Sequence, residues 1–447
     1  MRLSQRLAHH GASRSTVTAQ GPDARSQSPL SPGSSSGSSP TSGSGPRTER
    51  SATAGSDRGF VHEVIEVAVG REHPRPAILG EDLAEVDLPT APALAGALRS
   101  LARLPAAGLD PRCPAVMFDL ETTGLIGQPG SLIGVAGAAW HVAPDRIRVE
   151  QWSLGRVGAE AAMLADLDAM LRPRVGPRCA FVTFNGASFD LPLLHRRLVR
   201  HGIYRPTDDP LRAPHVDLLP SARRLWRDRG PDCRLGTLEQ HHLRLRREGD
   251  VGGAEVVELL WRWLEDPDPA AAADLARVKR HNRIDVLSLA ALAFTMHDRL
   301  WRPVDAVERL RAARHHDRLG RASQAHALLK PLLGALARGA ARGRGSDLAI
   351  EAGLLAAEID RRAGRRDEAA RLWARVCRAV PGHPQAHEAL AKHLEHRARR
   401  PAEALAVAAA SVTPCARRLI RLRTKAGDGA VIPPVAQVVD AWADPSG

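Results

Sequence analysis

Hydrophobic and polar residues alternate in several short runs of the first half of the chain, and this period predicts β-strands. In residues 60–69, Val61, Ile65, Val67 and Val69 share one face of such a strand. Further apolar runs predict strands at 115–125, 133–142, 146–154 and 180–185. The runs at 133–142 and 146–154 follow one another closely, which indicates a meander.

Helical periodicity separates and follows these strands, at residues 91–104, 160–173, 188–202 and 274–296. This order predicts an α/β fold, a mixed sheet flanked by helices. Beyond Pro303 the strand signals end and alanine-rich helical periodicity takes over, which predicts an all-α region.

The first residues contrast with both regions. Residues 20–58 are rich in Gly, Ser and Pro and have almost nothing to bury, so we expect a disordered tail. The predicted organisation is a tail at 1–58, a strand and helix extension at 59–112, an α/β domain at 113–300 and a helical domain at 301–447.

The helical domain resembles tetratricopeptide repeats. Ala369, Trp373, Val376 and Pro381 stand where such a repeat places its small, aromatic and terminal proline residues. Ala404 repeats the Ala369 position near the expected period of about 34 residues. The resemblance implies a helical-repeat domain, and a plain helical bundle is the alternative.

Composition narrows the class of protein. No run approaches 18 apolar residues, the start has no apolar secretory segment, and the five cysteines are scattered. We therefore expect a cytoplasmic protein without a membrane partner. Residues 301–447 account for +11 of the net charge of +13, which favours either a bound polyanion or a solvated helical surface that recruits a protein.

Four carboxylates in three segments carry the chemistry. Asp119 and Glu121 lie two apart on a predicted strand, so both project to one side. Asp190 lies in the first turn of the helix after the strand at 180–185, and Asp285 lies in an apolar helix four residues after His281. Buried carboxylates need compensation, and their oxygens suit Mg²⁺ or Mn²⁺. The alternatives are an exposed edge pair, a helix cap and a structural His–Asp pair.

The segments FDLETTGL, FNGASFDLPLL and HNRID occur in this order and resemble the three motifs of DEDD-superfamily 3′–5′ exonucleases. The chain is similar to the YprB-type ribonuclease H-like domain over residues 113–297. The resemblance implies an RNase H-like fold in the domain at 113–300.

By position, Asp119, Glu121, Asp190 and Asp285 would bind two divalent metal ions, Mg²⁺ or Mn²⁺, and catalyse phosphodiester hydrolysis. Asp119 would bridge the ions, Glu121 and Asp285 would serve the nucleophile, and Asp190 would serve the leaving group. His281 would act on the attacking water. It departs from the superfamily, since three residues separate it from Asp285, which is the register of the tyrosine subtype.

The resemblance also implies where the nucleic acid binds. The predicted substrate-binding residues follow the first motif or flank the second, and they are Thr122, Thr123, Gly124, Leu125, Asn185 and Phe189. We expect a metal-dependent 3′–5′ exonuclease that hydrolyses single-stranded DNA or RNA from a free 3′ end. The alternatives are a non-catalytic nucleic-acid-binding or scaffold protein that recruits a partner through its repeats, and an endonuclease for branched or hybrid substrates.

Overall fold

The computed structural model describes residues 51–53, 58–69, 86–104, 108–124, 130–337 and 344–444. Residues 1–50 of the predicted disordered tail lie outside these ranges, as does Leu125. Ser51–Thr53, which was also assigned to that tail, forms a short strand, β1, because it pairs antiparallel with the next strand.

Seven strands form one sheet in the order β1-β2-β5-β4-β3-β6-β7. After β1 they are β2 (Phe60–Ala68), β3 (Ala115–Thr122), β4 (Ile133–Ala143), β5 (Arg146–Leu154), β6 (Ala180–Thr183) and β7 (His215–Asp217). Across the sheet, neighbouring strands pair antiparallel from β1 through β2, β5 and β4 to β3. The pairs β3 with β6 and β6 with β7 are parallel. The sheet is therefore mixed, as the sequence predicts.

Helices cover both faces of this sheet. They are α1 (Ala91–Leu101), α2 (Glu160–Leu171), α3 (Asp190–Arg200), α4 (Leu218–Trp226), α5 (Leu235–Leu238), α6 (Gly253–Glu265) and α7 (Pro269–Trp301). Alternate residues of β3 enter opposite cores: Met117 packs with α1, α4 and α7, and Phe118 packs with α2 and α3. Because both faces are covered, β3 is apolar on both sides until it reaches its two carboxylates.

The helix α7 is longer than the periodicity predicts, with 33 residues. The Asp268 side chain caps its start by accepting a hydrogen bond from the Ala271 amide at 2.6 Å, and Pro269 occupies the first turn. Capping residues such as Asp268 and Pro269 do not add to the apolar periodicity of a helix. Hydrophobic periodicity alone therefore missed the first turn. The helix packs against β3, β4 and β5.

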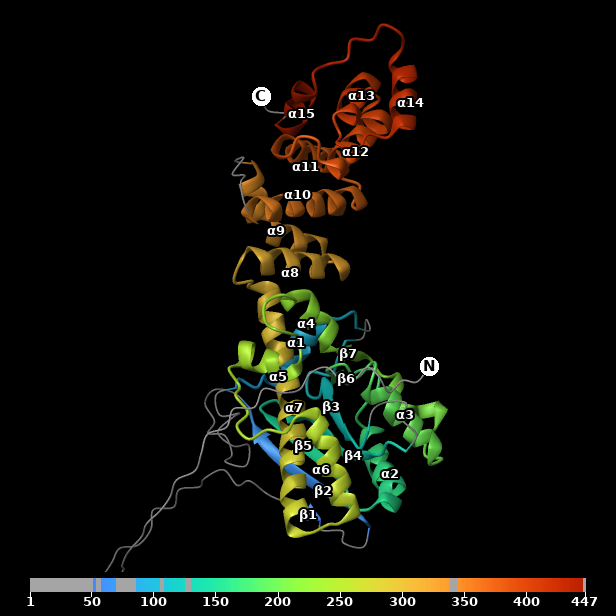
Figure 1. Ribbon diagram of the computed structural model, residues 1–447, viewed down its shortest axis with the longest axis vertical. Helices are drawn as coiled ribbons and strands as arrows, with labels where there is room; N and C mark the ends of the chain where they lie inside the picture. The colour runs from blue at the N-terminus through green and yellow to red at the C-terminus, as the bar shows by residue number, and fades with distance from the viewer. Residues whose placement is uncertain are drawn as a thin grey trace, which may run out of the picture. The chain divides into compact units, whose positions relative to one another are not determined.

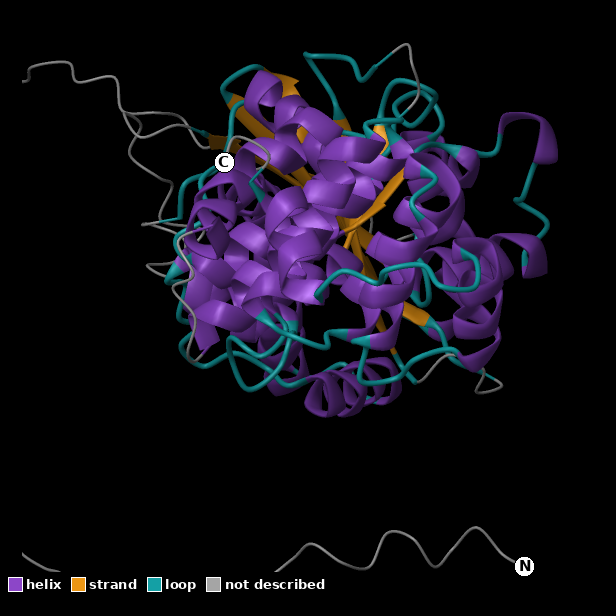
Figure 2. Cartoon of the chain, turned by 90° about the horizontal axis from the view of Figure 1, so that it is seen from above, coloured by secondary structure: helices purple, strands orange, loops and turns teal. Residues whose placement is uncertain are grey.

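The remaining helices are α8 (Ala306–Arg318), α9 (Ala322–Ala337), α10 (Arg344–Arg362), α11 (Arg366–Ala379), α12 (Pro384–His393), α13 (Pro401–Ala409), α14 (Ala416–Ala426) and α15 (Val435–Ala443). Each of α8 to α13 contacts the next helix along the chain, and α15 packs on α11 and α13 (Figure 1). Their shared core buries Ala325, Ala369 and Ala404 completely. No strand occurs among the described residues after Trp301, and helices dominate the molecule (Figure 2). The predicted succession of an α/β region and an all-helical region is confirmed.

Among the described ranges, no helix is both long enough and apolar enough to cross a lipid bilayer.

Candidate metal centre

The strand β3 supplies the first two carboxylates. Asp119 and Glu121 follow Met117 on the same face of the strand, the face that α7 covers. Both carboxylates are only partly accessible, since the strand lies in the interior of the sheet between β4 and β6. Two charges therefore stand at the end of an otherwise apolar strand.

The helix α7 crosses this face and supplies the next groups. Asn282 donates hydrogen bonds from Nδ2 to the Asp119 carbonyl oxygen at 3.2 Å and to Asp119 Oδ2 at 2.9 Å. The residue that pairs with Asp119 on the neighbouring strand β4 is Gly137, which has no side chain to keep the helix away. A Cβ at Gly137 would lie 2.1 Å from Asn282 Oδ1. The absence of a side chain on β4 thus allows α7 to meet β3.

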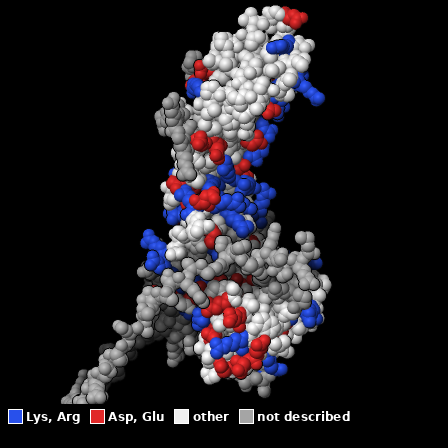
Figure 3. Space-filling view, in the orientation of Figure 1, with Lys and Arg blue, Asp and Glu red and all other residues white. Residues whose placement is uncertain are grey.

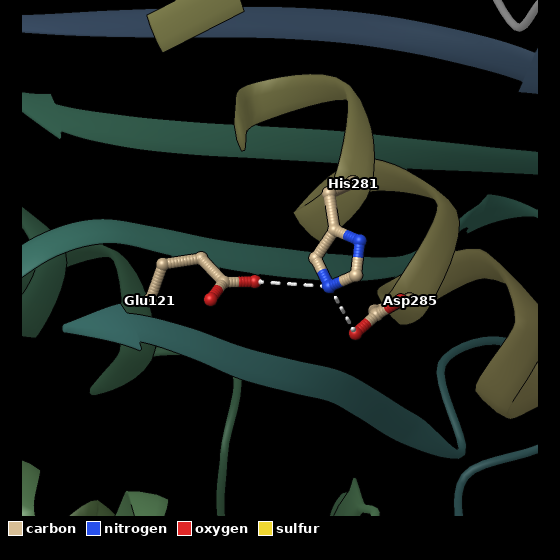
Figure 4. A group of neighbouring side chains, drawn as sticks. All are labelled: Glu121, His281 and Asp285. Carbon is tan, nitrogen blue, oxygen red and sulfur yellow. Dashed lines mark ion pairs between the residues drawn. The ribbon is translucent and has the colours of Figure 1, made fainter. Parts of the chain in front are cut away.

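Three of the predicted residues converge to metal-ligand spacing. In Figure 4 the side chains of Glu121, His281 and Asp285 point toward one another, and their ligand atoms lie within 4.8 Å of one another. His281 Nε2 is 3.7 Å from Glu121 Oε1 and 3.6 Å from Asp285 Oδ2. The helical spacing of four residues between His281 and Asp285 places both on one face, as expected.

Two residues of the loop before α6 hold this group, and sequence reasoning missed both. His281 Nδ1 lies 2.8 Å from Asp250 Oδ1, and Arg247 Nη2 lies 2.5 Å from Asp285 Oδ1. We assign the Nδ1 proton to the bond with Asp250, which leaves Nε2 directed at the carboxylates. For Asp250 the available signal was the segment GDVGGAEVVELLWRWL, which carries part of the family resemblance and does not extend to Arg247.

Asp190 occupies the first turn of α3 and is only 4% exposed. Its Oδ1 accepts a hydrogen bond from the Leu120 amide at 3.2 Å, so α3 is tied to the middle of the carboxylate pair on β3. Among the described residues, neither Asp190 nor Asp119 joins a group of three with the 4.8 Å ligand spacing. The structure brings both next to the group of Glu121, His281 and Asp285 without including them in it.

Burial and mutual repulsion make the carboxylates of the site harder to ionise. Burial raises the pKa of Asp119 to about 7, with a further contribution from the Asp285 charge. Burial and the Asp119 charge also raise the pKa values of Glu121 and Asp190. Ionising all of them in one place therefore requires positive charge nearby.

His281 responds in the opposite sense. Burial alone would lower its pKa, but the hydrogen bond with Asp250 and the charges of Asp285 and Glu121 raise the pKa to about 9. A proton on the imidazole thus balances the carboxylates. A divalent cation would meet the same electrostatic need, and the carboxylate and imidazole donors are ligands that such a cation accepts. The residues fit a metal ion.

The predicted substrate residues after β3 form a turn. The Thr122 hydroxyl donates to the Gly124 carbonyl oxygen at 2.8 Å, and the Thr123 hydroxyl accepts from the Leu132 amide at 2.9 Å. All three residues are buried. Leu125 lies outside the described residues, so its place relative to this turn is not described.

The other two predicted substrate residues are accessible. Asn185 is exposed and has a left-handed backbone with φ of 69°, a conformation that Asn tolerates better than most residues. Its amide donates to Asp217 Oδ1 at 2.8 Å. Phe189 is partly exposed just before α3. Both lie in the loop that joins β6 to the helix carrying Asp190.

Comparison with known proteins identifies the class of domain. Residues 116–297 match the family model of the RNase H superfamily. This match covers the described strands β3 to β7 and most of α7, and with them all four carboxylates and His281. An RNase H-like domain is typical of nucleases, which act on nucleic acid with divalent metal ions.

One relative is the uncharacterized protein YprB of Bacillus subtilis (strain 168). It is 35% identical to this chain over 189 residues. The alignment covers 41% of this chain and 42% of that protein, so the chain spans less than half the length of the relative.

Proposed function

We propose that the protein is a metal-dependent 3′–5′ exonuclease that hydrolyses phosphodiesters of single-stranded DNA or RNA by a two-metal-ion mechanism. The observation that carries the proposal is the meeting of Glu121, His281 and Asp285 beside Asp119 and Asp190. Binding of nucleic acid alone gives no reason to bury four mutually repelling carboxylates. A nuclease needs them.

In this proposal Asp119, Glu121, Asp190 and Asp285 hold two divalent ions, Mg²⁺ or Mn²⁺. When bound, such ions supply charge stabilisation to the phosphodiester and make water more acidic. Asn282 fixes the Asp119 carboxylate by its hydrogen bond, and Arg247 fixes Asp285 by its ion pair. The protein thus orients its own acidic ligands with neighbouring donors.

His281 would accept the proton of the attacking water at Nε2. The hydrogen bond between Nδ1 and Asp250 orients the ring for this role. Proton acceptance requires a neutral imidazole, whereas the pKa of about 9 favours the charged form in the metal-free protein. Divalent cations at Glu121 and Asp285 would repel the imidazolium and so favour the neutral form.

We further propose that residues 301–447 form a tetratricopeptide-like domain for a protein partner or nucleic acid. Buried Ala369 and Ala404, and the packing of successive helices, support this proposal. The proposal includes the domain limits at residues 58, 112 and 300. The proposed limit at residue 300 falls at the end of α7, which ends at Trp301, before α8 begins at Ala306.

The test is a degradation assay on single strands of DNA and RNA that are blocked at the 3′ or the 5′ end, with Mn²⁺ or EDTA. Asp119→Asn and Asp190→Asn should each abolish cleavage and leave the fold intact. Glu265→Gln, which changes an exposed carboxylate of α6, is the matched control and should retain full activity.

The end blocks test the direction. A 3′ block should stop degradation of the wild type, and a 5′ block should not. Cleavage in EDTA, or full activity of Asp119→Asn, would reject the metal mechanism and favour the scaffold alternative. Cleavage of strands blocked at both ends would indicate an endonuclease.

A further inference from the structure

Arginines of two helices line a cavity outside the metal centre. Arg311, Arg314 and Arg318 recur at intervals of three and four along α8 and so share one face. On the neighbouring α4 side the lining residues are Pro220, Arg223, Arg224 and Arg227. The cavity has a volume of about 430 Å³ and contains no acidic lining residue among those described. We call this cavity the arginine groove.

Most of this positive charge is not neutralised. Arg311 lies 3.5 Å from Asp228, and Arg314 pairs with Glu351. The other four guanidinium groups have no carboxylate within 4.0 Å in the part of the chain that the structure describes: Arg223, Arg224, Arg227 and Arg318. Burial and the neighbouring Arg318 charge lower the pKa of Arg224, as expected for cations held together. An anion in the groove would relieve this repulsion.

The groove continues toward the metal centre. A second cavity of about 630 Å³ shares Arg223 and Arg227 with it, and extends to Phe184 and Asn185. These two residues directly follow β6 and begin the loop that leads to Asp190. Asp228 and Asp232 also line this second cavity, but each has an arginine partner, Arg311 and Arg234 respectively. A continuous lining therefore runs from the loop beside the metal centre to the arginine groove.

The two sides of the groove are held together before any ligand binds. Trp226 Nε1 donates to Glu308 Oε1 at 3.2 Å, and Arg311 Nη1 donates to the Leu225 carbonyl oxygen at 3.1 Å. Figure 3 shows Lys and Arg side chains gathered over α8 and the adjoining helices, with a few acidic ones among them. The helices that carry the cations are thus held against each other, which reduces the entropy lost when a ligand binds.

We propose that a single-stranded nucleic acid runs along this path, with its 3′ end at the metal centre and the phosphates further upstream in the arginine groove. This inference rests on the proposed nuclease function and adds the course of the substrate. Guanidinium groups bind phosphate oxygens in pairs, and a strand supplies one negative charge per nucleotide. Together the two cavities, which meet at Arg223 and Arg227, exceed the needs of a single phosphate ion, and the end of the larger one at Asn185 favours a chain that reaches the loop before Asp190.

The test compares two double variants of the full chain. Arg224→Gln with Arg318→Gln removes two unpaired charges from the groove. Arg417→Gln with Arg423→Gln removes two exposed arginines of α14, which is remote in sequence and does not line the groove. The probe is a fluorescent single-stranded DNA of about 20 nucleotides, a length that exceeds a typical single-strand site. It is titrated in EDTA at several salt concentrations so that no cleavage occurs.

We expect the groove variant to bind about tenfold more weakly near 0.1 M salt, and its salt slope to fall by about 1.4, since each lost single-strand phosphate contact removes about 0.7. The α14 variant should match the wild type. Thermal melts check folding, and the groove variant should melt no lower than the wild type, because two repelling cations have been removed.

The inference is overturned if both double variants bind alike, if the wild type does not bind the strand, or if poly-glutamate competes as well as the strand does. The last result would indicate an acidic protein in the groove. A wild type that binds through the groove yet cleaves nothing with Mn²⁺ would reject the nuclease proposal and support the groove as a nucleic-acid site. The two failures are therefore distinguishable.

Discussion

At the scale of single residues, the neighbours of each group decide its chemistry. His281 has one ring nitrogen on Asp250 and the other facing Glu121 and Asp285. The same imidazole on an exposed helix would have an ordinary pKa and no fixed direction. Asp250 therefore matters to the site although it does not face the metal position.

The role of Asp250 as a positioning residue is testable by Asp250→Asn. We expect turnover to fall about 10–100-fold, the usual loss when a partner of a metal-site histidine is removed. The hydrogen bond with Asp250 raises the pKa of His281, so its weakening should move the acidic limb of the pH–rate profile to lower pH. Glu265→Gln is the control. Unchanged turnover together with an unmoved limb would show that Asp250 does not orient His281.

Gly137 offers a second test, by steric means. Gly137→Ala would place a methyl group against Asn282, and overpacking of this kind costs about 1–3 kcal/mol. We expect lower stability in urea unfolding and reduced turnover, because Asn282 would lose its bond to Asp119. In Gly96→Ala the new methyl group meets nothing within 4 Å inside α1, and this variant should gain about 0.5–1 kcal/mol. Wild-type behaviour of Gly137→Ala would mean that Asn282 does not position Asp119.

At the scale of elements, the sequence predicted what hydrophobic periodicity can reveal. The strands β2 to β5 and the helices α2, α3 and α7 are long and half or fully buried, so their period is visible, and β6 shows as a short run of four buried residues. The strand β7 was missed because its three residues, His215–Asp217, are too few to show alternation. Shared faces also predicted the pairs Asp119 with Glu121 and His281 with Asp285.

Loop residues of the site could not be predicted in this way. A loop has no period, and the bond between Asp250 and His281 joins residues 31 positions apart. Only the folded chain shows that this loop returns to α7. Similarly, the closeness of α7 to β3 depends on Gly137, which gives no signal of its own in a strand rich in Gly and Ala.

The docking of α8 on α1 can be tested by pH. His315 is 2% exposed, and its Nε2 lies 3.0 Å from the Ser100 carbonyl oxygen. Burial lowers the pKa of His315 to about 4, below the ordinary value of 6.5, although the bond to Ser100 opposes the shift. The unfolded chain therefore takes up the proton first on acidification. The contribution of His315 to the free energy of unfolding is therefore fully present above about pH 6.5. It falls by about 3 kcal/mol as the pH is lowered toward 4.

The measurement is urea unfolding at pH 7.5, 6 and 5 for the wild type and His315→Gln. Burial also lowers the pKa values of other histidines, such as His316 and His141, so their protonation in acid destabilises the protein as well. The difference between the wild type and the variant therefore isolates the effect of His315. The variant should be less stable at pH 7.5 and show the smaller decline. Parallel pH dependence in both proteins would contradict the assignment of a neutral, docked His315.

At the scale of the whole molecule, the carboxylates make the site and destabilise the fold. In EDTA, Asp119 is the clearest case, because its pKa is raised from 3.8 to about 7. The folded protein holds this proton more tightly than the unfolded chain does. The contribution of Asp119 to the free energy of unfolding is therefore most favourable below about pH 4 and is lost as pH rises through about 7.

Asp119→Asn should thus raise the stability of the metal-free protein at pH 8, by about 1–4 kcal/mol, while it abolishes cleavage. Mn²⁺ should raise the melting temperature of the wild type and much less that of the variant, because only the wild type keeps the full ligand set. Thermal melts in EDTA and in Mn²⁺ measure both effects. If Asp119→Asn is less stable than the wild type in EDTA, the charge of Asp119 does not destabilise the metal-free protein.

The hydrogen bond from Asn282 to Asp119 has a consequence for synthesis, since it joins residues 163 positions apart. A ribosome that adds about 5–20 residues per second needs on the order of ten seconds to travel from one to the other. During that interval the nascent chain already contains β3 and its two acids but lacks the helix that completes the site. The candidate metal centre therefore does not exist on the growing chain until His281, Asn282 and Asp285 have been added.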